Sequence, residues 1–444
     1  MMKEKTKFKQ TEIGMIPEDW EIKSIKDIVK INERTINKDF RFPEIEYIDI
    51  DSVDNGIINN KQHFQLNDAP SRAKRIIRKN DIIISTVRPN LKHFAFIKEA
   101  KPNTIVSTGF AVISCKKVNS KFLYYYLTTD KVTDHLSAIA DSHTSTYPSF
   151  NPNVIENLLA PYPREQEQER IAKILSDLDS KIELNQQMNK TLEEMGRTIF
   201  KRWFVDFEFP NEEGKPYKSS GGEMIYNEEL RKEIPKGWRV VRLIETAEFT
   251  RGFSYSGSEK SKTDGQYVFI TLNSVKEFGG FKREFSYLTS DRVKEKHFVQ
   301  HGDIVIANTE QTKTGTLLGY PALVEFPWNY QKYEGVFSHH ITKVTPRLKN
   351  FKHYLYHYLF LNQKDAVKYN TGSVIWALDV DNWSKNEKIL LPHPEVLFTF
   401  DLALENMFSK ISANNLQVET LSRIRDSLLP RLMSGKIRVP VEIK

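Results

Sequence analysis

The feature that most constrains the fold is a stretch near the middle of the chain, residues 164–207, which has the pattern of one long helix. Apolar residues recur there at spacings of three and four, as at Ile171, Leu175, Leu178 and Ile182, so that a helix would bury one stripe. The stretch contains no proline. At about 1.5 Å per residue, such a helix would be roughly 50–60 Å long. A small domain cannot cover a stripe of that length, so the helix needs a comparably long partner.

The predicted partner is a second amphipathic stretch near the C-terminus, residues 402–429, which we expect to end at Pro430. A constant offset aligns the two stretches, and it places Ile182 on Ile411 and Asn185 on Asn414. Two such helices most simply pair as a coiled coil, in which a buried asparagine fixes the register. The alternative is that they are two ordinary amphipathic core helices.

The whole chain reads as two copies of one plan. Each copy opens on an isoleucine–proline pair followed by a tryptophan, in IPEDW at 16–20 and in IPKGW at 234–238. Short β-rich runs follow in the same order, with DIIIS at 81–85 matching DIVIA at 303–307, and each copy closes on a long helical stretch. We therefore predict an α+β fold, with two mixed α/β domains joined by two long helices. The predicted boundaries are 1–163 for domain 1, 164–207 for the central helix, 208–231 for a linker, 232–394 for domain 2, and 395–444 for the C-terminal helix and tail.

Length and composition limit the class of protein. A chain of 444 residues is too long for one hydrophobic core, which agrees with several domains. The net charge of +7 comes from 65 basic and 58 acidic residues, a balance that suits a folded protein and is compatible with a polyanionic partner. No run of about 18 apolar residues predicts a membrane span, and the charged start MMKEKTKFKQ does not resemble a secretory signal. The single cysteine, Cys115, excludes an internal disulfide framework and is expected in a buried strand, so we expect a cytoplasmic protein.

The motifs of common catalytic and cofactor sites are missing from the sequence. There is no phosphate-binding G-x-x-x-x-G-K-[ST] loop, no G-x-G-x-x-G and no H-E-x-x-H. The adjacent pair His339–His340 is predicted to lie in a strand, where neighbouring side chains face opposite ways. We therefore predict a chain that is not an enzyme, with no catalytic residue, no metal site and no bound cofactor.

Nucleic-acid binding has better support, from basic residues and polar loops. A basic run at 71–79 precedes STVRPNLK at 85–92, and the matching position of the second copy holds the polar loop NTEQTKTGT at 308–316. Lysine and arginine neutralise phosphates, while arginine, asparagine and glutamine also pair with base edges. The alternatives are a solvated helix face for the basic run and plain turns for the threonine-rich loops. The candidate DNA-binding residues are Arg72, Lys74, Arg75, Arg88, Asn90, Lys92, Ser142, His143, Thr144, Ser145, Thr146 and Tyr147 in domain 1, and Arg251, Asn308, Thr309, Gln311, Thr312, Lys313, Thr314, Asn370, Thr371 and Ser373 in domain 2.

At this point the sequence resembles a known family. The helical segment 167–207, together with 85–92, the GYPALV run at 319–324 and the repeated domain openings, is similar to the specificity subunit of type I restriction–modification systems. The resemblance covers essentially the whole chain. It implies two target-recognition domains, each reading one half of a bipartite, asymmetric site in double-stranded DNA. It also implies that the two long helices pair antiparallel as a spacer.

The resemblance further implies that catalysis belongs to partner subunits. Two modification subunits would methylate adenine with S-adenosylmethionine, and restriction subunits would translocate DNA with ATP and Mg²⁺. The two helical regions depart from exact repetition, since the second is less charged and ends in LLPRLMSGKIRV at 428–439. Base-contacting residues cannot be carried over from the family, because recognition domains differ there.

Two readings from other classes remain open. One is a coiled-coil scaffold that carries two protein-binding domains without DNA specificity. The other is a nuclease or methyltransferase with degenerate motifs, which would be active as an isolated chain.

Overall fold

The structure is a computed structural model that describes residues 6–143, 147–326 and 334–440. The chain divides into two compact units: unit 1 comprises 1–183 and 420–444, and unit 2 comprises 184–419. Each unit contains one globular α/β region and a part of both long helices. No helix in the described ranges is both long enough and apolar enough to span a membrane.

The globular part of unit 1 is built on two four-stranded sheets. The first is antiparallel in the order β11-β10-β13-β4, and the second has the order β8-β5-β12-β9 with a parallel pair, β5 and β12. The strands are β4 (Val29–Ile31), β5 (Glu44–Ile48), β8 (Gln62–Gln65), β9 (Ala73–Ile76), β10 (Ile82–Ser85), β11 (Phe94–Phe96), β12 (Thr104–Ser107) and β13 (Phe110–Cys115). Cys115 ends β13, and burial raises the pKa of its thiol to about 12.

Strand β10 shows why the β-rich runs are continuously apolar. Ile82 and Ile84 pack with Leu123 and other residues of the helices on one face of the sheet. Ile83 points to the other face, into a second core that includes Val106 of the neighbouring sheet. Because successive strand residues face opposite sides, a strand between two buried layers must be apolar at every position.

The remaining elements of unit 1 frame these sheets. Two helices cover residues 120–143, and the first ends at its C-cap Thr128, whose hydroxyl and N–H both donate to the carbonyl of Tyr124. The elements are β1 (Phe8–Thr11) paired with β2 (Gly14–Pro17), β3 (Glu21–Ser24) paired with β14 (Leu159–Tyr162), β6 (Val53–Asp54) paired with β7 (Ile57–Ile58), and the helices α1 (Ile25–Ile28), α2 (Ser120–Leu127), α3 (Asp130–His143) and α4 (Asn153–Glu156).

Unit 2 repeats the order of both sheets and adds one edge strand, β19, to the second. Its antiparallel sheet has the order β25-β23-β27-β18, and its second sheet, β19-β21-β20-β26-β22, contains a parallel pair, β20 and β26. The DIVIA run forms β23 in the position that DIIIS occupies as β10, which confirms the internal repeat. These strands are β18 (Ala247–Arg251), β19 (Lys260–Ser261), β20 (Tyr267–Ile270), β21 (Ser286–Leu288), β22 (Phe298–Val299), β23 (Ile304–Ala307), β25 (Pro321–Leu323), β26 (Gly335–Phe337) and β27 (Ile341–Pro346).

The other elements of unit 2 also have counterparts in unit 1. The hairpin β15–β16 matches β1–β2, and the pair β17–β29 matches β3–β14. The bounds are β15 (Met224–Asn227), β16 (Lys232–Pro235), β17 (Arg239–Arg242), β24 (Thr309–Glu310), β28 (Trp376–Ala377), β29 (Lys388–Leu391), α6 (Leu243–Thr246), α7 (Lys352–Leu361), α8 (Gln363–Val367) and α9 (Val380–Asn386). The segment between the central helix and β16 is packed, since Phe209 is buried and stacks on Trp238.

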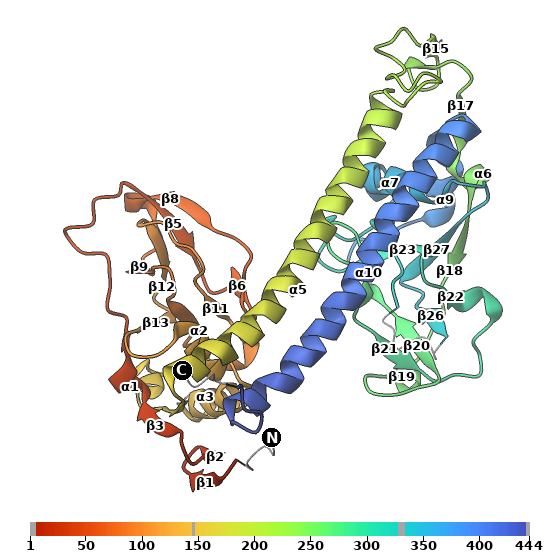
Figure 1. The fold of residues 1–444 in the computed structure, drawn as a ribbon. Helices are drawn as coiled ribbons and strands as arrows, with labels where there is room; N and C mark the ends of the chain where they lie inside the picture. The colour runs from red at the N-terminus through yellow and green to blue at the C-terminus, as the bar shows by residue number, and fades with distance from the viewer. Residues whose placement is uncertain (1–5, 144–146, 327–333, 441–444) are drawn as a thin grey trace. The chain divides into compact units, whose positions relative to one another are not determined.

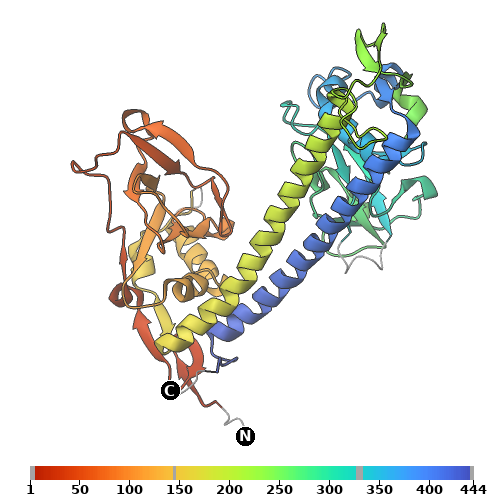
Figure 2. The same cartoon turned by 45° about the horizontal axis from the view of Figure 1, so that its top comes forward.

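The two long helices are α5 (Glu165–Phe200), which continues into a π-helical turn at Lys201–Val205, and α10 (Pro394–Met433). Within each unit they run side by side in opposite directions, α5 in yellow-green and α10 in blue (Figures 1 and 2). In unit 1, Arg425 Nη1 donates to Asp179 Oδ1 at 2.9 Å. In unit 2, Asn185 Nδ2 donates to Gln417 Oε1 at 2.7 Å. The predicted antiparallel pairing is confirmed.

Unit 2 places a polar layer inside the helix pair. The predicted seam asparagines Asn185 and Asn414 are 1% and 3% exposed. They do not bond to each other, because antiparallel helices bring an early residue of one beside a late residue of the other. Asn414 Nδ2 donates to Asn189 Oδ1 at 2.8 Å, and Asn189 Nδ2 donates to Asn415 Oδ1 at 2.7 Å. Each buried amide therefore finds an amide partner on the facing helix.

Two local predictions were wrong, and one alternative is excluded. Helix α10 does not end at Pro430 but continues to Met433, because Leu432 and Met433 are buried in a cluster with Trp20. The alternative of a solvated helix face for the basic run at 71–79 is excluded, since residues 73–76 form edge strand β9. His339–His340 does not lie in a strand; it forms the turn between β26 and β27, and the two ring centroids are 3.9 Å apart.

Candidate nucleic-acid interface

Unit 1 brings two of the predicted polar stretches together. The loop at 86–92, which follows β10, lies beside residues 147–150, and we call these segments the first loop pair. The Arg88 N–H donates to the Pro148 carbonyl at 2.9 Å, and the Phe150 N–H donates to the Thr86 carbonyl at 3.0 Å. The Arg88 guanidinium also lies 5.2 Å from the centre of the Tyr147 ring, a cation–π contact. Two candidates that are far apart in the sequence thus form one surface.

The backbone of the first loop pair aims its side chains outward. Arg88 and Lys92 have φ of +44° and +56° and flank a single 3₁₀ turn, Pro89–Leu91. This left-handed conformation costs a non-glycine residue about 1–2 kcal/mol. Arg88 and Asn90 are exposed, whereas Lys92 already pairs with Asp130 at 2.7 Å. Arg88 and Asn90 are therefore better placed than Lys92 to meet a ligand.

The other candidates of unit 1 differ in accessibility. Arg72 and Lys74 are exposed on and beside edge strand β9. Arg75 is half-buried, and burial lowers its pKa because desolvation penalises the charged form. The hydroxyl of Ser142 is used within α3, where it donates to the Ile139 carbonyl at 2.7 Å. The side chain of His143 and residues Thr144, Ser145 and Thr146 lie outside the described residues.

Unit 2 builds the same arrangement from different residues. The loop at 308–316, which follows β23, lies beside the loop at 369–378, and we call these segments the second loop pair. Strand β24, in the loop at 308–316, pairs antiparallel with β28, in the loop at 369–378, and the Leu378 N–H donates to the Asn308 carbonyl at 2.8 Å. The Lys313 ammonium donates to the Ser373 carbonyl. The predicted stretches 308–314 and 370–373 therefore share one surface.

The organising residue of the second loop pair is Glu310, which sequence reasoning missed. Its carboxylate is 1% exposed and accepts seven hydrogen bonds from described residues, five of them from backbone N–H groups at 314–318 and two from the hydroxyls of Thr312 and Thr314. Burial opposes the charge, but the hydrogen bonds outweigh it and lower the pKa of Glu310 to about 2. The only signal in the sequence was one acid inside a threonine-rich loop.

The candidates of the second loop pair divide into exposed and structural residues. Asn308 is buried, and its amide donates to the His339 carbonyl at 3.3 Å. Asn370 folds its own loop, because Oδ1 accepts from the N–H groups of Gly372 and Ala377, each at 3.0 Å. The exposed candidates are Gln311, Thr312, Lys313, Thr314, Thr371 and Ser373.

Two further candidates border the histidine turn. The Thr309 hydroxyl lies 3.0 Å from His340 Nδ1. Arg251 is exposed at the end of β18. Burial lowers the pKa of His340, and the neighbouring charges of His339 and Arg251 lower it further. A neutral His340 can take part in hydrogen bonds without adding charge to this edge of the unit.

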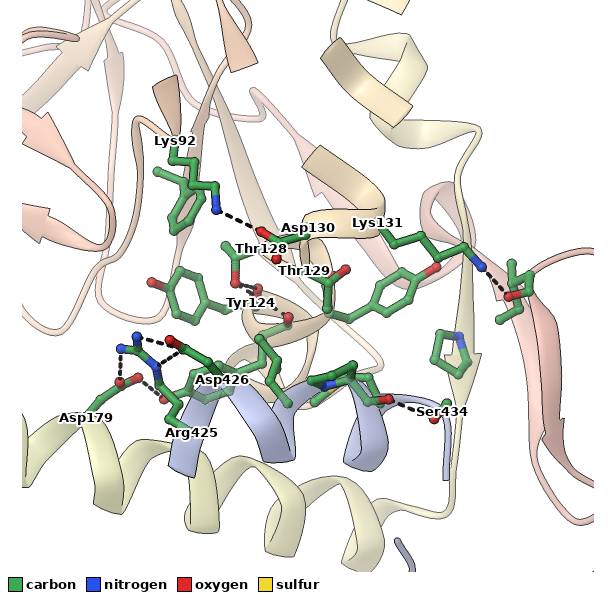
Figure 3. Close-up of a pocket in the computed structure, with 18 of the residues that line it drawn as sticks. Lys92, Tyr124, Thr128, Thr129, Asp130, Lys131, Asp179, Arg425, Asp426 and Ser434 are labelled. Atoms are coloured by element: carbon green, nitrogen blue, oxygen red, sulfur yellow. Dashed lines mark hydrogen bonds and ion pairs between the residues drawn. The ribbon is translucent and has the colours of Figure 1, made fainter. Parts of the chain in front are cut away.

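Unit 1 also contains a cavity of about 390 Å³ beside the first loop pair (Figure 3). Its walls include the ion pair of Lys92 with Asp130, the ring of Tyr124, and the ion pair of Arg425 with Asp179. Each charge of these two ion pairs therefore already has an opposite partner in the cavity wall. In unit 2, Phe360, near the end of α7, lies under the guanidinium of Arg197 at 4.2 Å, and its ring centroid is 5.6 Å from that of Tyr320.

No group of three or more histidine, cysteine, aspartate or glutamate side chains within the described ranges is arranged to hold a metal ion. The arrangement that the structure does show is a pair of polar loops at the same edge of each unit.

Comparison with known proteins identifies relatives along the whole chain. The family model described as "Type I restriction modification DNA specificity domain" matches twice, at residues 17–194 and 235–406. The MjaIX specificity subunit of a type I restriction enzyme from Methanocaldococcus jannaschii is 28% identical, over 98% of this chain and 97% of its own length. The HindI specificity subunit from Haemophilus influenzae is 25% identical, over 94% of this chain and 100% of its own. The crystal structure of a type I S subunit from M. genitalium shares the fold, with a TM-score of 0.56, 16% identity, and coverage of 96% of this chain and 98% of that one.

Proposed function

Because the chain belongs to the type I restriction–modification DNA specificity family, we propose that its two loop pairs each contact one half of a bipartite DNA site. Chains of this family are the sequence-recognising subunits of a restriction–modification complex and are not its catalytic subunits. They act together with DNA and with the other subunits of the system. The scaffold without DNA specificity is not favoured by these relatives.

The observation that carries the proposal is the contrast between frame and loops. The antiparallel sheet has the same strand order in both units, and the loop after β10 matches the loop after β23. The side chains on these loops differ, with Arg88, Asn90 and Tyr147 in unit 1 and Gln311 and Lys313 in unit 2. A repeated frame with unlike polar loops suits two readers of unlike half-sites.

We assign different roles to the candidates by their chemistry. Arginine, asparagine and glutamine can form paired hydrogen bonds with base edges, so Arg88, Asn90 and Gln311 are the proposed base readers. Lysine is a point charge that suits phosphate, so Lys74 and Lys313 are proposed to position the backbone. Arg72 and Arg251 are also proposed phosphate contacts, because arginine, like lysine, neutralises phosphates. Buried or internally bonded candidates such as Asn308 and Asn370 would shape the loops.

The partners and cofactors follow from the same proposal. Two modification subunits would bind the chain and methylate adenine with S-adenosylmethionine, and restriction subunits would use ATP and Mg²⁺ to translocate DNA. The recognition domains would be 1–163 and 232–394, with 208–231 as a crossing segment. The paired helices would act as the spacer between half-sites. A helix of roughly 50–60 Å is long enough to separate two half-sites whose centres lie one turn of DNA apart, about 34–36 Å. A role on genomic DNA would place the chain in the cytoplasm.

The proposal is tested by mapping methylated adenines in cells that express the chain with its modification subunits. We expect methylation at a split site that disappears when this chain is deleted. Exchange of residues 1–163 for the matching region of another family member should change one half of that site and leave the other half unchanged. A change in both halves would contradict the assignment of one half-site to each unit.

Point variants locate the readers within each unit. Gln311→Ala should relax base preference at one position of the second half-site by about 1–3 kcal/mol. Lys313→Ala should weaken binding to all sequences alike and reduce its dependence on salt. Exposed Lys262, outside the second loop pair, provides a matched control for the lost charge. Equal effects of Lys262→Ala and Lys313→Ala would count against a specific phosphate contact.

A further inference from the structure

In the second loop pair, residues 374 and 375 form a tip with two adjacent apolar side chains that are exposed to solvent. Val374 is 75% exposed, which is the highest value for a large hydrophobic side chain among the described residues, and Ile375 is 49% exposed. The next residue, Trp376, turns inward and packs on the core of unit 2. In this loop, Trp376 anchors the chain to the core of unit 2, while Val374 and Ile375 form the exposed tip.

The tip is held in place by hydrogen bonds from both sides. The Asn370 amide oxygen accepts from the N–H groups of Gly372 and Ala377, and the Thr371 hydroxyl donates to the Ala377 carbonyl at 3.1 Å. The chain folds back so closely that a Cβ on Gly372 would lie 1.6 Å from the Ile375 carbonyl oxygen. Valine and isoleucine are themselves stiff, because branching at Cβ restricts χ1. The apolar surface is therefore presented with little entropy left to lose on binding.

The surroundings of the tip indicate what it meets. Lys313 is tied to the carbonyl of Ser373, the residue before Val374, and exposed Gln311 lies on the same loop as Lys313. A cation and an amide beside an apolar tip suit a DNA groove, where phosphates, base edges and methyl groups lie together. Aliphatic side chains have no donor or acceptor. The feature of a base edge that they can select is the C5-methyl group of thymine.

We propose that Val374 and Ile375 are specificity-determining residues that contact a thymine methyl group in the half-site read by unit 2. The inference rests on the proposed function and adds one base identity to it. Burial of one methyl group against the tip makes binding about fourfold tighter, the equivalent of roughly 0.8 kcal/mol.

The test replaces thymine by uracil, which removes the methyl group and keeps every hydrogen-bonding group and phosphate. The full-length chain, assembled with its modification subunits, is titrated with duplexes in which each thymine of either strand is replaced in turn. We expect one thymine of the second half-site at which uracil weakens binding by about fourfold. In Val374→Thr and Ile375→Thr, which keep the branched shape, this loss should shrink or vanish. Ile225→Thr, which alters an isoleucine on β15 that is 40% exposed, should keep the full loss.

Each outcome decides between the proposals. If uracil has no effect at any thymine of the second half-site, or if the threonine variants stay as sensitive as the wild type, the inference is overturned. If the variants weaken association with the modification subunits and leave uracil sensitivity intact, the tip is a protein contact and the inference is also overturned. Failure of the proposed function would look different, because Gln311→Ala and Lys313→Ala would then leave DNA binding unchanged as well.

Discussion

Replacement of Glu310 by glutamine should loosen the second loop pair while the rest of unit 2 stays folded. The carboxylate accepts hydrogen bonds at both oxygens, five at Oε1 and two at Oε2 among the described residues. A glutamine side chain has one oxygen, and its NH₂ group cannot accept. In the better of its two orientations the amide nitrogen replaces Oε2 and leaves the N–H groups of Leu317 and Leu318 without an acceptor.

The magnitude follows from this count. Each buried N–H without an acceptor costs about 1–3 kcal/mol, so Glu310→Gln should destabilise the loop by about 2–6 kcal/mol. That is a large part of the roughly 5–15 kcal/mol that stabilises a whole domain. Native-state hydrogen exchange at residues 314–318 reports this local free energy, and we expect these amides to exchange at least about 30 times faster.

A control and a pH titration sharpen the test. Glu284→Gln changes an exposed glutamate of the same unit that pairs with Lys282 at 2.6 Å, and it should leave exchange at 314–318 unchanged. Because the pKa of Glu310 is lowered from 4.5 to about 2, the wild-type loop should keep its protection above pH 4.5 and lose it as the pH falls towards 2. Exchange in Glu310→Gln within threefold of the wild type would refute the role assigned to this carboxylate.

Three further predictions concern the frame that carries the loops. Arg438→Ala should lower the free energy of unfolding by about 3–5 kcal/mol, because the carboxylate of Glu167, 2% exposed, would lose the guanidinium that bonds both its oxygens. Urea unfolding measures this loss, and Glu167→Gln added to the same chain should restore part of it. Asn414→Leu should lower the free energy of unfolding by about 1–3 kcal/mol, because the Asn189 amide oxygen loses its donor. A double-mutant cycle with Asn189→Leu should show a coupling energy above about 0.5 kcal/mol, and additive effects would contradict a shared polar layer. Burial lowers the pKa of His357 to about 4, so the free energy of unfolding should fall by up to about 3 kcal/mol as the pH drops from 6.5 to 4. In thermal melts, the stability of His357→Phe should depend less on pH over this range. The same pH dependence in the variant and the wild type would exclude this residue as the cause.

The internal repeat shows how much of the fold can be predicted from the local sequence pattern. The runs at 81–85 and 303–307 predicted buried strands, and they occupy the same position in two sheets of the same order. The three-four spacing predicted both long helices and their pairing, although the end at Pro430 was wrong. Proline lacks an N–H but tolerates a helical φ, and burial of the residues after it extended the helix by one turn.

The candidate site was predictable only in part. Sequence reasoning selected the four segments that form the two loop pairs, because polar runs without periodicity mark surface loops. It could not separate exposed Gln311 from buried Asn308, since the residue types alone do not report burial. It also missed Glu310, whose partners are backbone N–H groups that have no sequence signature.

Periodicity is a property of neighbouring residues, so the sequence by itself determined the two long helices, the buried strands and the duplication of the plan. Contacts between distant segments depend on how those elements pack, and only the tertiary structure decided them. It set residues 86–92 beside 147–150 and residues 308–316 beside 369–378, and it paired Asn189 with Asn414 across antiparallel helices. The surface proposed to read DNA arises from these distant contacts, because no single stretch of the chain contains it.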